Sequence, residues 1–226
     1  STLAYLCRKD GGKDKDRIAS ATFFTTMTDF SDVGEMSVFI DEEQITSIEA
    51  DMAEKGYLDG SAMASSFNML RANDLIWGPA IRSYMLGETP PAFDLLFWNA
   101  DQTRMPKTLH MAYLRQMYGA NALATGAFEI GGERVDLSKV EIPLFFQASR
   151  EDHIAPMNSV YRSARLFSGA AVTYTLSGSG HIAGVINAPS ARKYQHWTND
   201  ALPPTLAEWQ AGAVEHPGSW WEHWAA

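Results

Sequence analysis

The chain has 226 residues, of which 46% are hydrophobic, enough for the core of one α/β domain or of a domain with an insertion. The formal net charge is -9, from 18 basic and 27 acidic residues, and no dense basic stripe offsets it, so nucleic-acid binding is not expected. The single cysteine, Cys7, excludes an intramolecular disulfide and a cysteine-based metal cluster. No run of residues is long and apolar enough to span a bilayer.

The first half of the chain predicts one strand and then a mostly helical block. The segment RIASATFFTT (17–26) carries aromatic and β-branched residues and predicts a buried strand. Helices are expected over residues 42–55, 61–72, 74–86 and 107–118. Asp41 is a suitable N-cap for the first helix, and Gly87 ends the third. The opening segment STLAYLC resembles the middle of a helix, so we expect the chain to begin inside a larger protein.

The second half alternates strands and helices. Gly131–Gly132, between two short alternating arms, predicts a hairpin. A strand, a helix and a strand are expected over residues 143–148, 157–167 and 171–176. This order suits the second half of a mostly parallel sheet with a helical insertion after its first strand. We therefore expect an α/β core over residues 1–32 and 126–226, with a helical cap over residues 33–125.

Two strands end in residues that suit acid–base chemistry. Asp152 follows the strand 143–148, and His181 lies in a glycine-rich turn after the strand 171–176. Their separation of 29 residues and their order are those of the acid and the base in an α/β-hydrolase triad. Because the carboxyl ends of parallel strands meet at one edge, we expect the two side chains to touch there. The imidazole would move a proton, the carboxylate would orient it, and the glycines around His181 would let the turn approach neighbouring backbone.

Other assignments of these residue types remain open. His153 is a competing base, and Asp29, just past the first predicted strand, is a competing acid. The EDH segment is also compatible with a solvated turn, and His181 with a structural histidine. His216 and His223 lack metal-ligand spacing, so no metal site is expected.

A nucleophile is not found in the sequence. Neither G-x-S-x-G nor G-x-C-x-G occurs, and Ser179 is flanked by Ser177 and His181 where that motif requires glycines. Cys7 lies in a helix-like stretch and is best explained as a small structural residue. If the fold is that of a hydrolase, the nucleophile is expected before Ser1, outside this chain.

The ordered segments SREDHIAP, SGSGHIAGVINAP, HWTNDALP and GSWWEHW resemble the C-terminal catalytic half of class I polyhydroxyalkanoate synthases. Earlier segments, including ATFFTTMTDFSDVGE and PPAFDLLFWNADQTRMP, resemble the same family in the same order, so the resemblance covers essentially the whole chain. It implies an α/β-hydrolase fold and polymerisation of (R)-3-hydroxyacyl-CoA, with 3-hydroxybutyryl-CoA the expected substrate, without a cofactor. By position it implies Asp152 as the acid, His181 as the base and a nucleophilic cysteine just ahead of a stretch like STLAYL.

The resemblance also assigns the helical insertion. It implies a cap that covers the active site and mediates homodimerisation, in a cytoplasmic enzyme associated with polyester granules. Candidate substrate-binding residues are Trp98, Asn99, Asp101 and His153. A role of Trp98 in anchoring the cap is an open alternative. Two other functions also remain open, an esterase or polyester depolymerase of the same fold and a non-catalytic granule-associated subunit.

Overall fold

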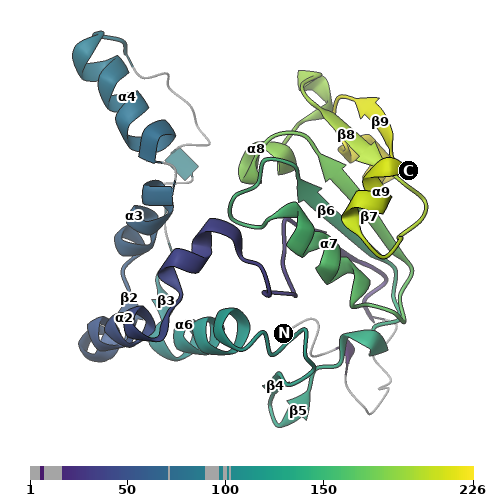
Figure 1. Ribbon diagram of the computed structural model, residues 1–226, viewed down its shortest axis with the longest axis horizontal. Helices are drawn as coiled ribbons and strands as arrows, with labels where there is room; N and C mark the ends of the chain where they lie inside the picture. The colour runs from purple at the N-terminus through teal and green to yellow at the C-terminus, as the bar shows by residue number, and fades with distance from the viewer. Residues whose placement is uncertain (1–5, 8–16, 71, 90–96, 99–100, 102) are drawn as a thin grey trace. The chain divides into compact units, whose positions relative to one another are not determined.

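A computed structural model describes residues 6–7, 17–70, 72–89, 97–98, 101 and 103–226 of the chain (Figure 1). The chain divides into two compact units, the first made of Ser1–Ser37 with Gln116–Ala226 and the second of Val38–Arg115. None of the helices in the described ranges is long and apolar enough to cross a membrane.

A five-stranded sheet forms the centre of the first unit. Its strands, in spatial order, are β1 (Ala21–Phe24), β6 (Leu144–Ser149), β7 (Val172–Ser177), β8 (Gln195–Thr198) and β9 (Val214–Pro217). The pairs β1–β6 and β6–β7 are parallel, whereas β7–β8 and β8–β9 are antiparallel. The α/β class is therefore confirmed. The three parallel strands lie where strands were predicted, although β1 is shorter than the predicted segment, and β8 and β9 were not predicted.

One face of the sheet is apolar and carries most of the core. Phe146 of β6 and Tyr174 of β7 are buried there, because alternate residues of a strand point to the same side. Helix α7 (Met157–Arg165) and helix α9 (Leu206–Ala211) meet this face, with the ring of Tyr174 4.9 Å from that of Trp209 and 5.0 Å from that of Tyr161. Burial of such rings contributes about 2–3 kcal/mol each.

Toward the carboxyl ends of β6 and β7 the opposite face is polar although it is also buried. Gln147 Nε2 donates to Ser149 Oγ over 3.0 Å and to Ser177 Oγ over 2.7 Å. Helix α8 (His181–Val185) comes very close to this cluster, since a Cβ on Gly184 would lie 2.2 Å from Ser149 Oγ. Only glycine permits this approach, so residue type at one position determines how near α8 lies to the end of β6.

The hairpin and the first helix follow their sequence signals closely. Strands β4 (Glu129–Ile130) and β5 (Glu133–Arg134) pair across Gly131 and Gly132, which both have positive φ, 62° and 80°, as a tight two-residue turn requires. Helix α2 spans Glu42–Lys55 as predicted, and the Asp41 carboxylate accepts the Gln44 amide over 2.8 Å as its N-cap. These local predictions are confirmed.

The second unit is helical. Besides α2 it contains β2 (Tyr57–Leu58), α3 (Gly60–Leu70), η3 (Asn73–Trp77), α4 (Gly78–Ala80), η4 (Ile81–Met85), β3 (Met105–Pro106), α6 (Lys107–Ala112) and the start of η5 (Tyr113–Gly119). Helix η2 (Gly34–Phe39) begins in the first unit and ends in the second. A small core of Ile45, Met52 and Met111 holds α2 against α6. The predicted helices 74–86 and 107–118 are present but contain π-helical turns.

Candidate active site

The loop after β6 holds the carboxylate of Asp152 in a fixed position. Its Oδ1 accepts the backbone amides of Ile154 and Ala155, each over 2.8 Å, which closes a tight turn around the side chain. Pro156 follows as the N-cap of α7, so the loop is short and anchored at both ends. The Asp152 side chain is completely buried, and a buried charge needs such partners.

The second oxygen of this carboxylate meets the imidazole of His181. The distance from His181 Nδ1 to Asp152 Oδ2 is 2.8 Å, so the predicted contact is present. An ionised carboxylate only accepts hydrogen bonds, so Nδ1 carries the proton and donates it. In the neutral ring the remaining nitrogen, Nε2, is then an acceptor, and the side chain of His181 is 31% exposed. The pair therefore has the geometry of an oriented general base.

The turn that carries His181 is strained at one residue. Ser179 has φ of +76°, in the left-handed region that non-glycine residues rarely adopt. Its carbonyl accepts the Glu151 amide over 3.0 Å, which ties the histidine turn to the Asp152 loop. The close backbone approach occurs at Gly178, where an added Cβ would lie 3.1 Å from Gln195 O. Strain of this kind costs about 1–3 kcal/mol and is concentrated at functional sites.

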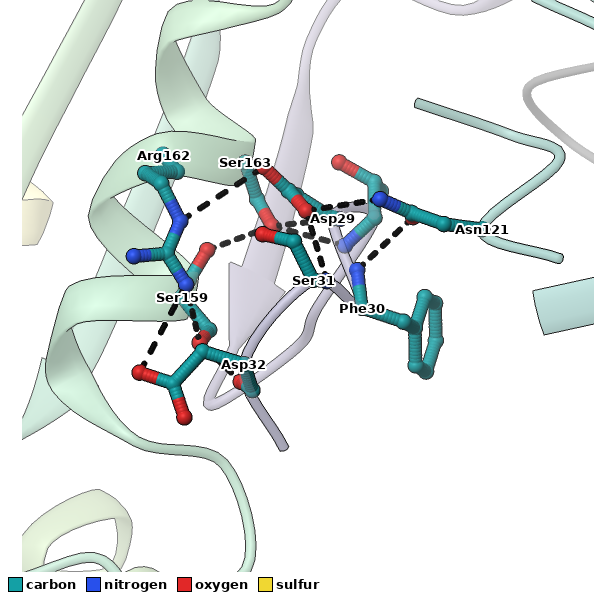
Figure 2. Close-up of polar contacts among 9 residues, drawn as sticks. Asp29, Phe30, Ser31, Asp32, Asn121, Ser159, Arg162 and Ser163 are labelled. Atoms are coloured by element: carbon teal, nitrogen blue, oxygen red, sulfur yellow. Dashed lines mark hydrogen bonds and ion pairs between the residues drawn. The ribbon is translucent and has the colours of Figure 1, made fainter. Parts of the chain in front are cut away.

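Asp29, the competing acid, lies in a different environment (Figure 2). Its Oδ1 accepts from Asn121 Nδ2 over 3.0 Å and from the Ser31 amide over 2.9 Å. Its Oδ2 lies 3.6 Å from Nε of Arg162 on α7, and its own amide donates to Ser163 Oγ over 3.0 Å. The same guanidinium lies 3.7 Å from an Asp32 carboxylate oxygen, so Arg162 ties the loop after β1 to α7.

This network determines the charge of Asp29. Burial by itself raises the pKa of the Asp29 carboxyl, but hydrogen bonds from Ser31 and Asn121 together with the Arg162 charge outweigh burial and hold the pKa below its ordinary value. Asp29 is thus a stable anion paired with a guanidinium that does not release its proton near neutral pH. This arrangement favours a structural role for Asp29.

The predicted substrate-binding residues are divided between the two units. His153 follows Asp152 in the same loop and is half-buried. Trp98 and Asp101 belong to the second unit, where Trp98 is 64% exposed and its carbonyl accepts the Asp101 amide over 3.1 Å. Asn99 and residues 1–5 of the opening segment lie outside the described residues.

Cys7 is not arranged as an activated nucleophile. It is buried, its thiol donates to Asp136 O over 3.0 Å, and burial raises the pKa of the Cys7 thiol. Reactive cysteines instead have lowered pKa values, which agrees with the structural assignment of this residue. Within the described part of the chain, no group of three or more histidine, cysteine or acidic residues could hold a metal ion.

Several residues between the ends of β6 and β7 and the helix of His181 were not singled out from the sequence. Gln147, Ser149 and Ser177 form the buried polar cluster beneath α8, and Gly184 allows its close approach. A signal for the cluster was present in β6, where polar residues follow Phe145 at a spacing of two in FFQAS. Polar residues at a spacing of two indicate that one face of a strand is polar.

The fold and the site define an α/β protein with a carboxylate–imidazole pair past the carboxyl ends of two adjacent parallel strands. No family model matches the sequence. The chain is 50% identical over 222 residues to the poly(3-hydroxyalkanoate) polymerase subunit PhaC of Rhizobium meliloti, which covers 98% of this chain and 36% of that relative. It is 50% identical over 224 residues to the poly(3-hydroxyalkanoate) polymerase of Methylorubrum extorquens, covering 99% of this chain and 36% of that relative.

The PhaC subunit of Cupriavidus necator is 44% identical over 214 residues, which is 92% of this chain and 36% of that relative. Nearly the whole length of this chain is therefore homologous to poly(3-hydroxyalkanoate) polymerases. It spans about a third of the length of these curated relatives.

Proposed function

We propose that this chain supplies the acid and the base of a poly(3-hydroxyalkanoate) polymerase with an α/β-hydrolase fold. The observation that carries the proposal is the 2.8 Å contact between His181 Nδ1 and Asp152 Oδ2, in a chain homologous to these polymerases. The substrates are (R)-3-hydroxyacyl-CoA thioesters, with 3-hydroxybutyryl-CoA first among them. No cofactor is required by this chemistry.

The proposed reaction uses a cysteine thiol from the part of the polymerase that this chain does not span. His181 Nε2 takes the thiol proton, and the thiolate attacks the thioester carbonyl. The carbon–sulfur bond to coenzyme A breaks, and the imidazolium returns the proton to the leaving thiolate. His181 then accepts the proton of a 3-hydroxyl group that attacks an acyl thioester. The ester bond forms as the carbon–sulfur bond of that thioester breaks, and the imidazolium gives its proton to the departing thiolate. Asp152 keeps the Nδ1 proton in place and stabilises the imidazolium in both steps.

We assign the second unit to a cap subdomain. The compact unit Val38–Arg115 lies within the cap expected over residues 33–125. An acyl-enzyme that must elongate has to be protected from water, which gives a cap a chemical purpose. Trp98, Asn99 and Asp101 from this unit and His153 from the other are the candidate substrate-binding residues.

We also propose that the cap mediates homodimerisation, in a cytoplasmic enzyme that associates with polyester granules. The second unit exposes large apolar side chains, among them Trp77 at 60%, Tyr84 at 90% and Met85 at 78%. All three lie in the helical stretch 73–85, and apolar side chains that form a shared exposed surface are typical of interaction sites. Sedimentation of a Tyr84→Ser, Met85→Ser variant of the polymerase tests the dimer, and an unchanged dimer would refute this part of the proposal.

The test is product analysis with the polymerase that contains this chain. (R)-3-hydroxybutyryl-CoA should give polyester and free coenzyme A, whereas free 3-hydroxybutyrate as the main product would identify a hydrolase instead. His181→Ala should lower coenzyme A release by about 10²–10⁴-fold. His153→Ala tests the competing base, which is also a candidate for substrate binding, and it should lower coenzyme A release less than His181→Ala does. A His181→Ala enzyme with near-normal polymer yield would overturn the proposal.

A further inference from the structure

The helix that begins with His181 ends in carbonyl groups that bind a distant segment. Helix α8 is only five residues long, and the last carbonyls of any helix lack partners within it. Trp220 Nε1 donates to Gly184 O over 2.8 Å, and Trp221 Nε1 donates to Val185 O over 2.8 Å. Two successive indoles from the C-terminal segment therefore satisfy the end of this helix.

A third donor extends the same contact. Ser219 Oγ donates to Asn187 O over 2.5 Å, just beyond α8, and also accepts the Trp221 amide over 3.2 Å. Consecutive residues 219–221 thus bind carbonyls that lie 32 to 36 positions earlier in the chain. Such a set of donors limits both rotation and translation of the short helix.

The indoles are themselves anchored on the strand that leads to Asp152. Trp220 is completely buried, and its ring centroid lies 6.0 Å from that of Phe145 on β6 and 5.7 Å from that of Phe24 on β1. Trp221 stacks on Trp220 with centroids 4.3 Å apart. The acid-bearing strand and the base-bearing helix therefore share one rigid aromatic support.

Helix α8 also cannot move closer to β6. The missing Cβ of Gly184 would lie 2.2 Å from Ser149 Oγ and 2.9 Å from Ser177 Oγ, so the helix already touches the strand ends at that residue. The indole donors hold the same residue through its carbonyl oxygen. Gly184 is thus restrained both by the strand ends and by the Trp220 indole. His181 lies only three residues earlier in the same helix.

We propose that Trp220, with Trp221 and Ser219, is a positioning residue that keeps α8 in the register at which His181 Nδ1 reaches Asp152. A helix of this length is not stable by itself, so its orientation depends on tertiary contacts. Displacement of a reacting group by 1 Å can cost about 10²-fold in rate. The catalytic consequence rests on the proposed function, whereas the positioning of the imidazole does not.

The test compares two tryptophan variants that differ in one respect. Trp220→Phe keeps an aromatic ring but removes the donor to Gly184 O. Trp209→Phe is the matched control, because Trp209 is also completely buried and its Nε1 has no hydrogen-bond partner among the described residues. Both variants lose a similar ring volume, so a general loss of packing affects both alike.

In this chain we expect amide hydrogen exchange at Gly184 and Ile186 to accelerate about tenfold in Trp220→Phe and to stay near the wild-type rate in Trp209→Phe. The NMR signal of the His181 Nδ1 proton should broaden or disappear only in Trp220→Phe. Trp221→Phe, at a half-buried ring, gives a smaller change of the same kind and keeps the test decisive if Trp220→Phe does not fold. Equal exchange and an unchanged His181 signal in the donor and control variants would overturn the proposal.

In the polymerase that contains this chain, Trp220→Phe should lower kcat about 10–100-fold with KM within twofold, and Trp209→Phe should leave both nearly unchanged. The activity test of the proposed function and the NMR test of the positioning role can fail independently. If His181→Ala leaves polymer yield intact, the proposed function is wrong while the NMR result still decides whether the indoles position the ring. If only the NMR comparison shows no difference, the positioning role is wrong and the proposed function stands.

Discussion

Two carboxylates follow two strands that pair with each other, and their surroundings give them different chemistry. Asp29 follows β1 and Asp152 follows β6, so both belong to one edge of the same parallel pair. Asp152 shares a hydrogen bond with an imidazole, whereas Asp29 lies beside the Arg162 guanidinium. An imidazole can exchange a proton near neutral pH and a guanidinium cannot. Position at a sheet edge therefore does not assign a catalytic role; the partner of the carboxylate does.

The largest expected difference between the two loops is in activity. In the polymerase that contains this chain, Asp152→Asn should lower coenzyme A release from (R)-3-hydroxybutyryl-CoA by about 10²–10⁴-fold, because the amide no longer holds the imidazole in one tautomer. Asp29→Asn should change the rate by less than about threefold, because Asp29 does not contact the imidazole pair. Steady-state kinetics on both variants measures this, and a larger loss in Asp29→Asn would exchange the two assignments.

Ser163→Ala should lower the stability of the Asp29 loop without affecting the Asp152 loop. The Ser163 hydroxyl accepts two buried backbone amides, that of Thr28 over 2.7 Å and that of Asp29 over 3.0 Å. Without it both donors are unpaired, so the free energy of unfolding should fall by about 2 kcal/mol. Urea denaturation measures the loss. Amide hydrogen exchange should become faster at Thr28 and Asp29 but not at Ile154, whose amide donates to Asp152. Equal acceleration at all three amides would contradict a separate network around Asp29.

Arg162→Gln should have a smaller effect at the same loop. The guanidinium lies 3.6 Å from Asp29 and donates to Ser159 Oγ over 3.0 Å, but its side chain is 40% exposed. We expect the free energy of unfolding to fall by about 1 kcal/mol. Arg134→Gln is the control, since Arg134 forms an ion pair in an exposed hairpin and should change stability by less than about 0.5 kcal/mol. Equal losses in the two variants would show that the Asp29 network adds no stability.

The smallest expected effect is on the pH dependence of stability. The pKa of Asp29 is held below its ordinary value in the folded chain, so the unfolded chain binds more protons in the acid range. This contribution is complete above the unfolded-state pKa of about 4 and is lost as the pH falls through the lower folded-state value. The stability difference between wild type and Asp29→Asn should therefore shrink between about pH 5 and pH 3, as followed by urea denaturation. A difference that stays constant over this range would contradict the expectation.

Local signals in the sequence predicted much of the fold. The Asp41 cap and the helix Glu42–Lys55 follow from side-chain capping, and the Gly131–Gly132 hairpin follows from the positive φ that its turn requires. The contact between Asp152 and His181 was predicted because the carboxyl ends of neighbouring parallel strands meet at one edge. Their catalytic roles stay a proposal, which the variants above test.

The rest could not be predicted because it depends on contacts between segments far apart in the chain. Strands β8 (QHWT) and β9 (VEHP) are short and have no clear alternation of apolar and polar residues, and they pair with β7 and with each other only in the folded chain. The same reason applies to Trp220, which the sequence places in a tryptophan-rich tail and the fold places against α8. No local property of that tail indicates which carbonyls its indoles bind.

The sequence by itself determined the α/β class, most of the element order, and the candidate acids and histidines that follow the strands, because periodicity, capping and turn chemistry act over a few neighbouring residues. The tertiary structure alone decided which carboxylate contacts the imidazole, which one the guanidinium holds, and what supports the helix of His181. Those outcomes are set by distances of about 3 Å between residues 29 to 134 positions apart, and such distances exist only once the chain has folded.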